Sequence, residues 1–252
     1  MKPPSSLALA SRGAARAPTD RRGRIGGGKL ASALSLGFVA ASLLLVGCAG
    51  GPPSPAWQSD AKSAMDRATV AYLEGHSKAS DAEMARVRST LSATGRAELL
   101  ARAELMHCAV QVASLVFERC TRFETLRADA APAERAYADH LAAKALARDE
   151  IARLPAAQQA VATALAGNEA AASGMQAGED PLSQLIAAAV LFQAGKASPA
   201  LIESATETAS AQAWRRPLLA WLKVQALRAE KAGDAAALKR LERRIALVEQ
   251  KP

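Results

Sequence analysis

The chain has 252 residues, of which 63 are alanine; half are apolar, 4% are aromatic, 22% are charged, and the formal net charge is +8. This length allows one large domain or two small ones, and the composition excludes wholesale disorder, collagen and a small disulfide-dense scaffold. Because alanine loses the least conformational entropy on entering a helix, a quarter alanine with few aromatic residues predicts an all-α fold.

The net charge belongs mostly to the N-terminus. Residues 1–47 hold seven Lys or Arg and one Asp, which accounts for +6 of the +8, whereas the chain from Cys48 onward has a net charge of only +2. A strongly basic chain suggests a nucleic-acid partner. Since the basic excess is confined to the first 47 residues, we expect no nucleic-acid binding.

Residues 30–46 form an uncharged apolar run behind a basic stretch. This order is typical of the n-region and h-region of a secretory signal peptide. The alternative is a permanent membrane anchor, for which 17 residues is the lower limit of a spanning helix. Arg21-Arg22 matches the twin-arginine export pattern only loosely, so general secretion is the expected route.

The four residues after this run, Leu45-Val46-Gly47-Cys48, resemble the lipobox of bacterial lipoproteins. The resemblance implies cleavage before Cys48, a diacylglycerol on the Cys48 sulfur and an acyl chain such as palmitate on the new amine. Ala49, rather than Asp, after the cysteine implies the periplasmic side of the bacterial outer membrane. Residues 1–47 are thus expected to be a lipoprotein signal peptide, and the membrane is an expected partner through the acyl chains on Cys48.

Residues 48–56 are expected to be the lipidated cysteine and a flexible, proline-rich linker with a reach of about 25 Å. Residues 57–252 are expected to be an α-helical repeat-like domain, because apolar residues recur there at spacings of three and four. Residues 97–117 are apolar nearly all round, which predicts the central helix, and glycines indicate a loop over 167–178. The other helices are predicted from Trp57 to before Gly75, from Ser80 to before Gly95, from Pro132, at 155–166, from Pro181 to before Gly195, and at 198–211, 214–231 and 234–249.

Paired helices joined by glycine turns predict antiparallel helix pairs stacked as an αα superhelix. The turns at 72–75 and 229–234 resemble those of tetratricopeptide units, although no 34-residue period runs through the chain, so the stack is expected to be irregular. The blocks at 114–120 and 214–221 are similar to those of an uncharacterised family of bacterial lipoproteins, and this resemblance brings no known activity.

Cys108 and Cys120 are the cysteines left beside the lipidation site. An oxidising compartment favours a disulfide between them. In one continuous helix they would lie about 18 Å apart, beyond the range of a disulfide, so the helix would have to end near Phe117 and the chain fold back. Two separate thiols are the alternative.

No catalytic residue, metal or cofactor is predicted. The three histidines lie 31 and 33 residues apart, without the spacing of a zinc site; His76 and His140 are expected at the surface and His107 near the core helix. Glu134 and Asp139 are the open candidates for a glycosidase pair, but charges alternating along helices are more typical of a solvated face.

Two further groups have alternative interpretations. Trp214 and Trp221, with Leu218 between them, are expected in a core or inter-helix seam rather than a ligand cage. The last helix carries an apolar stripe at Leu238, Leu241, Ile245 and Val248, and its basic residues are expected on the opposite, solvated face, with contact to an anionic envelope surface as the alternative. These basic residues are Lys239, Arg240, Arg243 and Arg244.

Anchor, linker and helical body together favour a non-enzymatic envelope lipoprotein whose body binds a protein partner. The alternatives are a cell-wall glycan-acting enzyme on an αα scaffold and a small-ligand-binding lipoprotein.

Overall fold

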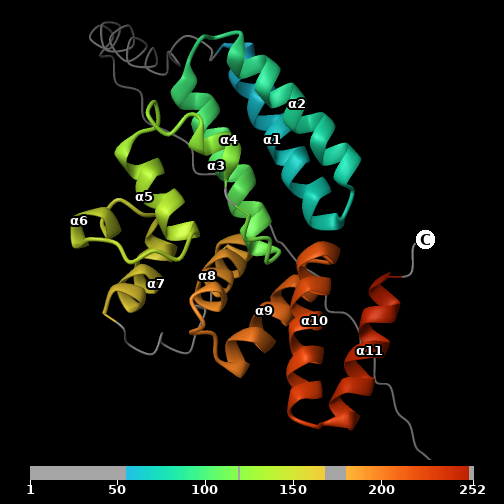
Figure 1. The fold of residues 1–252 in the computed structure, drawn as a ribbon. Helices are drawn as coiled ribbons and strands as arrows, with labels where there is room; N and C mark the ends of the chain where they lie inside the picture. Colours follow the sequence, from blue (N-terminus) through green and yellow to red (C-terminus); the bar gives the residue numbers. More distant parts are fainter. Residues whose placement is uncertain (1–54, 119, 168–179, 250–252) are drawn as a thin grey trace, which may run out of the picture. The chain divides into compact units, whose positions relative to one another are not determined.

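The computed structural model describes residues 55–118, 120–167 and 180–249. Over these ranges the chain forms eleven helices and no strand, which confirms the all-α prediction (Figure 1). The predicted signal peptide, Cys48 and the linker up to residue 54 lie outside the described residues, as does the loop predicted at 167–178 apart from Gly167.

The helices follow the predicted order, with two short additions, α4 and α6. Their bounds are α1 Ala56–Glu74, α2 Ser77–Ser92, α3 Ala97–Ala113, α4 Thr121–Glu124, α5 Pro132–Leu141, α6 Arg148–Ile151, α7 Ala156–Ala166, α8 Pro181–Gln193, α9 Pro199–Ala211, α10 Arg215–Lys231 and α11 Ala235–Glu249.

Local signals set most of these boundaries. Gly75 takes a left-handed conformation with φ 91°, and its N–H and that of His76 bond to carbonyls in the last turn of α1. Such a residue ends a helix readily because it lacks a Cβ. At α8, the Asp180 carboxylate accepts a bond of 2.9 Å from Ser183 N, and Pro181 occupies the first helical position. The predicted start of this helix is therefore confirmed.

The end of α3 differs from the prediction. The helix stops at Ala113 rather than Phe117, and Leu115 takes a left-handed conformation with φ 61°. The apolar residues that extended the sequence pattern, Val116 and Phe117, lie in the following loop and are partly buried. Apolar spacing alone cannot separate a helix from a loop that packs against the core.

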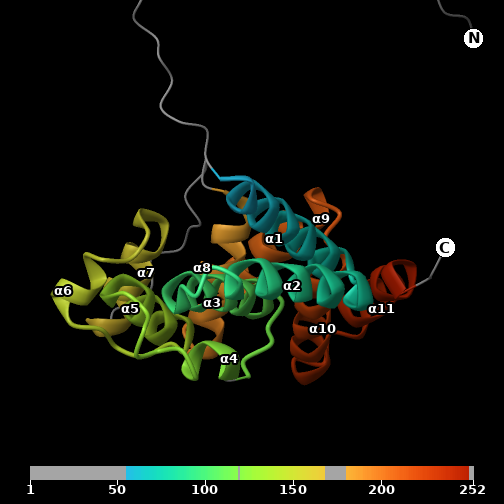
Figure 2. The same ribbon diagram turned by 90° about the horizontal axis from the view of Figure 1, so that it is seen from above.

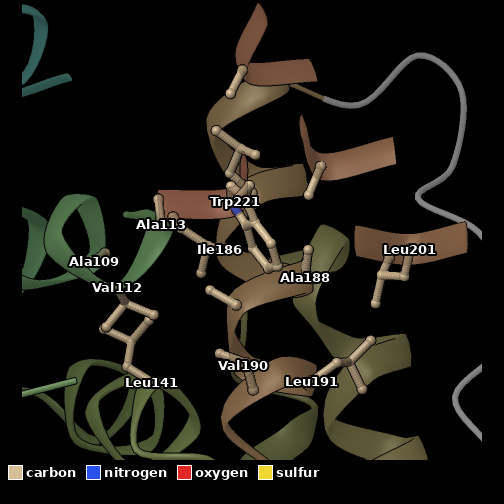
Figure 3. Close-up of a cluster of buried hydrophobic side chains, with 14 of the residues drawn as sticks. Ala109, Val112, Ala113, Leu141, Ile186, Ala188, Val190, Leu191, Leu201 and Trp221 are labelled. Atoms are coloured by element: carbon tan, nitrogen blue, oxygen red, sulfur yellow. The ribbon is translucent and has the colours of Figure 1, made fainter. Parts of the chain in front are cut away.

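The main core lies where α8 meets its neighbours. All seven residues from Leu185 to Leu191 are buried, and α8 contacts α3, α5, α7 and α9. α3, predicted to be the central helix, contacts α1, α2, α4, α5 and α8. Figure 3 shows side chains of this core from α3, α5, α8, α9 and α10. The centre of the fold is thus shared by α3 and α8.

Three smaller clusters lie beside this core, the smallest of them formed by Tyr72, Leu73 and Val110 of α1 and α3. Met65, Met84 and Val87 anchor the first, between α1, α2 and α3, where the Ser80 hydroxyl donates a bond of 2.9 Å to the Ala68 carbonyl. The second is formed by Ala136, Leu146, Leu154 and Ala162, which belong to α5, α7 and the segment between them. The α5–α7 segment therefore has a small apolar cluster of its own.

Neighbouring helices pack as pairs, most extensively α1 with α2 and α10 with α11. The two helices of each pair lie side by side in Figures 1 and 2. Helices far apart in sequence also meet, since α3 contacts α8 and α1 contacts α10. At the latter contact the Arg216 guanidinium lies 4.2 Å from the Tyr72 ring centroid, and its Nε donates a bond of 2.7 Å to the Tyr72 carbonyl. This contact joins the last turn of α1 to the first turn of α10.

Candidate functional site

A pocket of about 950 Å³ lies among α3, α4, α5 and the end of α8. This volume is at the upper end of the range for small-molecule sites. The pocket lining combines apolar and charged side chains. Its lining includes Val112, Phe117, Leu141, Glu124, Arg127, Asp139, Lys144, Cys120 and Gln193.

Four charged residues of the lining form an ion-pair network centred on Arg127. Its guanidinium donates bonds of 2.7 and 2.9 Å to the two Glu124 oxygens and two bonds of 3.2 Å to Asp139, while Lys144 Nζ lies 2.7 Å from Asp139 Oδ1. The charges of these four side chains balance. The network therefore holds α4 to α5 and leaves little free charge for a ligand.

This network also sets the protonation states of the pocket. The hydrogen bond to Glu124 raises the pKa of Arg127 above its ordinary value, and the same bond lowers the pKa of Glu124. Burial alone would raise the pKa of Asp139, but hydrogen bonds from Lys144 and Arg127 outweigh it and the pKa is lowered. Both carboxylates are thus held ionised, which suits a structural role rather than proton transfer.

A disulfide joins Cys108 to Cys120, and Cys120 lines the pocket. Cys108 is buried in α3, Cys120 immediately precedes α4, and their Cα atoms are 5.6 Å apart across a sequence separation of 12. The turn at Ser114 and Leu115 makes this approach possible, four residues before the turn expected from the sequence. The bridge fixes the loop that carries Phe117 against the pocket.

Gln193, the last residue of α8, lines this pocket. Its Oε1 atom is buried and has no hydrogen-bond partner within the part of the chain that the structure describes. Buried carbonyl oxygens are normally paired, so an unpaired acceptor beside the pocket is unusual. Nothing in the sequence pattern of α8 distinguishes Gln193, because its environment depends on helices far along the chain.

Glu134 and Asp139 do not share a cleft. Asp139 lines the pocket described above, whereas Glu134 lines a separate, mainly apolar groove of about 370 Å³ with Met106 and Tyr137. Glu134 Oε1 lies 2.6 Å from Arg102 Nη2. The arrangement of two carboxyl groups on opposite sides of one glycosidic bond is therefore not present in this pair.

One of the three histidines is placed differently from expectation. His76 is exposed and His107 is half-buried, as predicted, but His140 is fully buried, which corrects the surface prediction. His140 Nε2 lies 3.1 Å from Gln158 Oε1, and Gln158 Nε2 donates to the Ser183 carbonyl. A short helix such as α5 does not reveal its buried face when the helices covering it follow later in the sequence. Burial lowers the pKa of both His107 and His140.

The two tryptophans belong to the packing of α10. Trp214 precedes the first turn of the helix, and Trp221 is fully buried with its ring centroid 5.7 Å from that of Phe192 in an edge-to-face contact. Trp221 is therefore part of the main core, in agreement with the predicted seam. The basic residues of α11 face outward, apart from Arg244, which is half-buried and pairs with Glu207 at 3.0 Å.

Within the described ranges, no group of three or more His, Cys, Asp or Glu side chains is arranged to hold a metal ion. None of the described helices is both long and apolar enough to cross a bilayer. The predicted lipidation site, Cys48, falls outside the described residues. In comparisons with known proteins, no family model matches the chain, and neither curated proteins nor solved structures include a significant match.

Proposed function

We propose that the protein is a bacterial outer-membrane lipoprotein, held by acyl chains on Cys48, whose helical body faces the periplasm. The observation that carries this proposal is the sequence Leu45-Val46-Gly47-Cys48 at the end of the apolar run at 30–46. Several acyl chains hold a protein at a membrane far more firmly than one. The disulfide between Cys108 and Cys120 supports the proposal, because such bridges persist in oxidising compartments.

The body acts in this proposal as a non-enzymatic protein-interaction or scaffold module. Its support is the architecture of packed helix pairs behind a linker that lets the body move about 25 Å from the anchor. We also propose that the packed helix pairs form an irregular, tetratricopeptide-like superhelix. Its irregularity accommodates the contacts of α3 with α8 and α1 with α10.

Replacement of the acylated cysteine tests the anchor. In cells that express the full chain, the wild-type protein should carry acyl groups on an N-terminal Cys48 by mass spectrometry and should fractionate with outer membranes. Cys48→Ala should accumulate as an unprocessed precursor of higher mass. A lipid-free mature N-terminus at another residue would contradict the proposal.

Crosslinking in intact cells tests the interaction role. A membrane-permeant crosslinker should join the wild-type protein to the same envelope protein in repeated experiments, and Cys48→Ala should lose this product because the uncleaved signal segment keeps its body at the inner membrane instead of the outer membrane. A body that forms no specific protein adduct while the anchor is intact would argue against a scaffold. The pocket containing Gln193 would then favour the small-ligand alternative.

A further inference from the structure

Charge is unevenly divided between the C-terminal helix pair and the rest of the mature chain. The α10–α11 hairpin, residues 215–249, carries nine Lys or Arg and four Asp or Glu, a net charge of +5. Residues 48–214 carry fifteen Lys or Arg and nineteen Asp or Glu, a net charge of −4. The small net charge of the mature chain therefore hides a basic hairpin on an acidic body.

Much of this positive charge is not neutralised within the protein. Lys223 pairs with Glu249 at 2.9 Å and Arg244 pairs with Glu207 at 3.0 Å. Five other cations of the hairpin are exposed and have no ion-pair partner among the residues that the structure describes. They are Arg228, Lys231, Lys239, Arg240 and Arg243.

Exposed leucines lie among these cations. Leu227 is 56% exposed, and Lys223 and Lys231, four residues before and after it, lie on the same face of α10. On α11, Leu247 is 68% exposed and shares a face with Arg243 and Arg240. Leu227 thus lies among Lys223, Glu230 and Lys231, and Leu247 lies beside Arg240 and Arg243, two of the cations with no ion-pair partner among the described residues.

We propose that the α10–α11 hairpin binds an anionic phospholipid surface through these cations, with Leu227 and Leu247 entering the interfacial layer. Cations near an anionic bilayer and apolar side chains at its interface both strengthen peripheral binding. The inference rests on the proposed Cys48 anchor, which keeps the body close to a bilayer. Binding of this kind would hold the body against the membrane rather than away from it.

The surface fits a lipid better than an acidic protein. Specific protein interfaces have a shaped, largely apolar centre that excludes water. Neither of the two pockets described above includes a residue of this hairpin, and its exposed leucines are single side chains surrounded by charge. A bilayer requires no pocket, because its head groups adapt to the spacing of the cations.

A fluorescent probe on the hairpin tests the proposal in the mature, lipidated protein. Ala246→Cys provides an exposed attachment site on α11, because Cys48 is acylated and the other two cysteines are bridged. The protein is reconstituted into vesicles of phosphatidylcholine alone or with phosphatidylglycerol, and an environment-sensitive dye reports contact with lipid. A probe at Ala152, an exposed residue after α6, is the positional control.

We expect the Ala246 probe to shift to the blue and gain about two-fold in intensity only in phosphatidylglycerol vesicles, and high salt to reverse the change. The double variant R240E/R243E should abolish it. The matched double variant R122E/R148E, at two exposed arginines of α4 and α6, should leave it intact.

Equal emission in both vesicle types, or a shift that survives R240E/R243E, would overturn the proposal. So would an in-cell crosslink to an acidic protein that depends on Arg240 and Arg243 while the vesicle signal does not. Flotation with pure phosphatidylcholine vesicles reports the acyl anchor separately. A protein that fails to float there lacks the anchor, and its flotation with phosphatidylglycerol vesicles then reports the hairpin alone.

Discussion

The bridge between Cys108 and Cys120 provides the most direct quantitative test of the structure. It closes a loop with a sequence separation of 12. The loss of entropy that such a loop imposes on the unfolded chain corresponds to about 3 kcal/mol. For a body of this size, 1 kcal/mol shifts the melting temperature by about 2–4 °C, so opening the bridge should lower it by about 6–12 °C.

The assay is thermal unfolding followed by far-ultraviolet circular dichroism, with and without dithiothreitol. Reduction should lower the melting temperature while the helical signal at room temperature persists, because the packed core supplies most of the stability. Cys120→Ser is the matched control, since its melting temperature should already be lowered and should not respond to dithiothreitol. Two titratable thiols in the unfolded, unreduced wild-type protein, or a melting temperature that ignores reduction, would refute the reasoning.

Three other predictions concern buried groups. Arg88 donates two bonds to Glu104, whose side chain is 5% exposed. Arg88→Met leaves this carboxylate buried without its partner and should therefore lower the free energy of unfolding in urea by about 3 kcal/mol, and adding Glu104→Leu should recover most of that loss. If the losses of the two single variants simply added in the double variant, the prediction would be wrong. Because burial lowers the pKa of His140 from 6.5, the native state resists protonation, and stability should fall by about 1.4 kcal/mol per pH unit as pH drops below 6.5 towards the native pKa. His140→Gln should remove that component of the slope, and an unchanged slope would exclude His140 as its source. Trp221→Ala should lower the free energy of unfolding in urea by about 3–5 kcal/mol. Trp221→Phe should lower it far less, since the indole N–H has no hydrogen-bond partner among the described residues. Equal losses of stability in the two variants would mean that this N–H is paired after all.

The helices were predictable because their ends carry local signals. Asp180-Pro181 marks the start of α8 and Gly75 the end of α1, and both act through the backbone of a few adjacent residues. The end of α3 was not predictable from the same reasoning. Val116 and Phe117 continue the apolar pattern although they lie in a loop, from which Leu115 and Phe117 pack on the core.

The pocket depends on contacts between segments distant in sequence, which local patterns do not encode. Arg127 reaches Asp139 twelve residues away, and Gln193 joins the same pocket from α8. In the sequence, Asp139 is one of many charges that alternate along helices, and its partner could not be chosen among the neighbouring cations. The surface prediction for His140 is wrong for the same reason, because Gln158 of α7 contacts the ring and is itself held by a bond to the Ser183 carbonyl of α8.

The contact between Tyr72 and Arg216 spans 144 residues of sequence, and this separation bears on how the protein is made. A chain elongating at 5–20 residues per second would leave the last turn of α1 without its contact to α10 for about 7–30 s. During that time the α1–α2 hairpin has no covering helix at its far end, and contacts of such high sequence separation form late in folding. A chain that terminates before Arg216 would therefore leave the N-terminal hairpin incompletely packed, and its exposed end would be open to proteases even though the missing residues lie at the opposite end of the sequence.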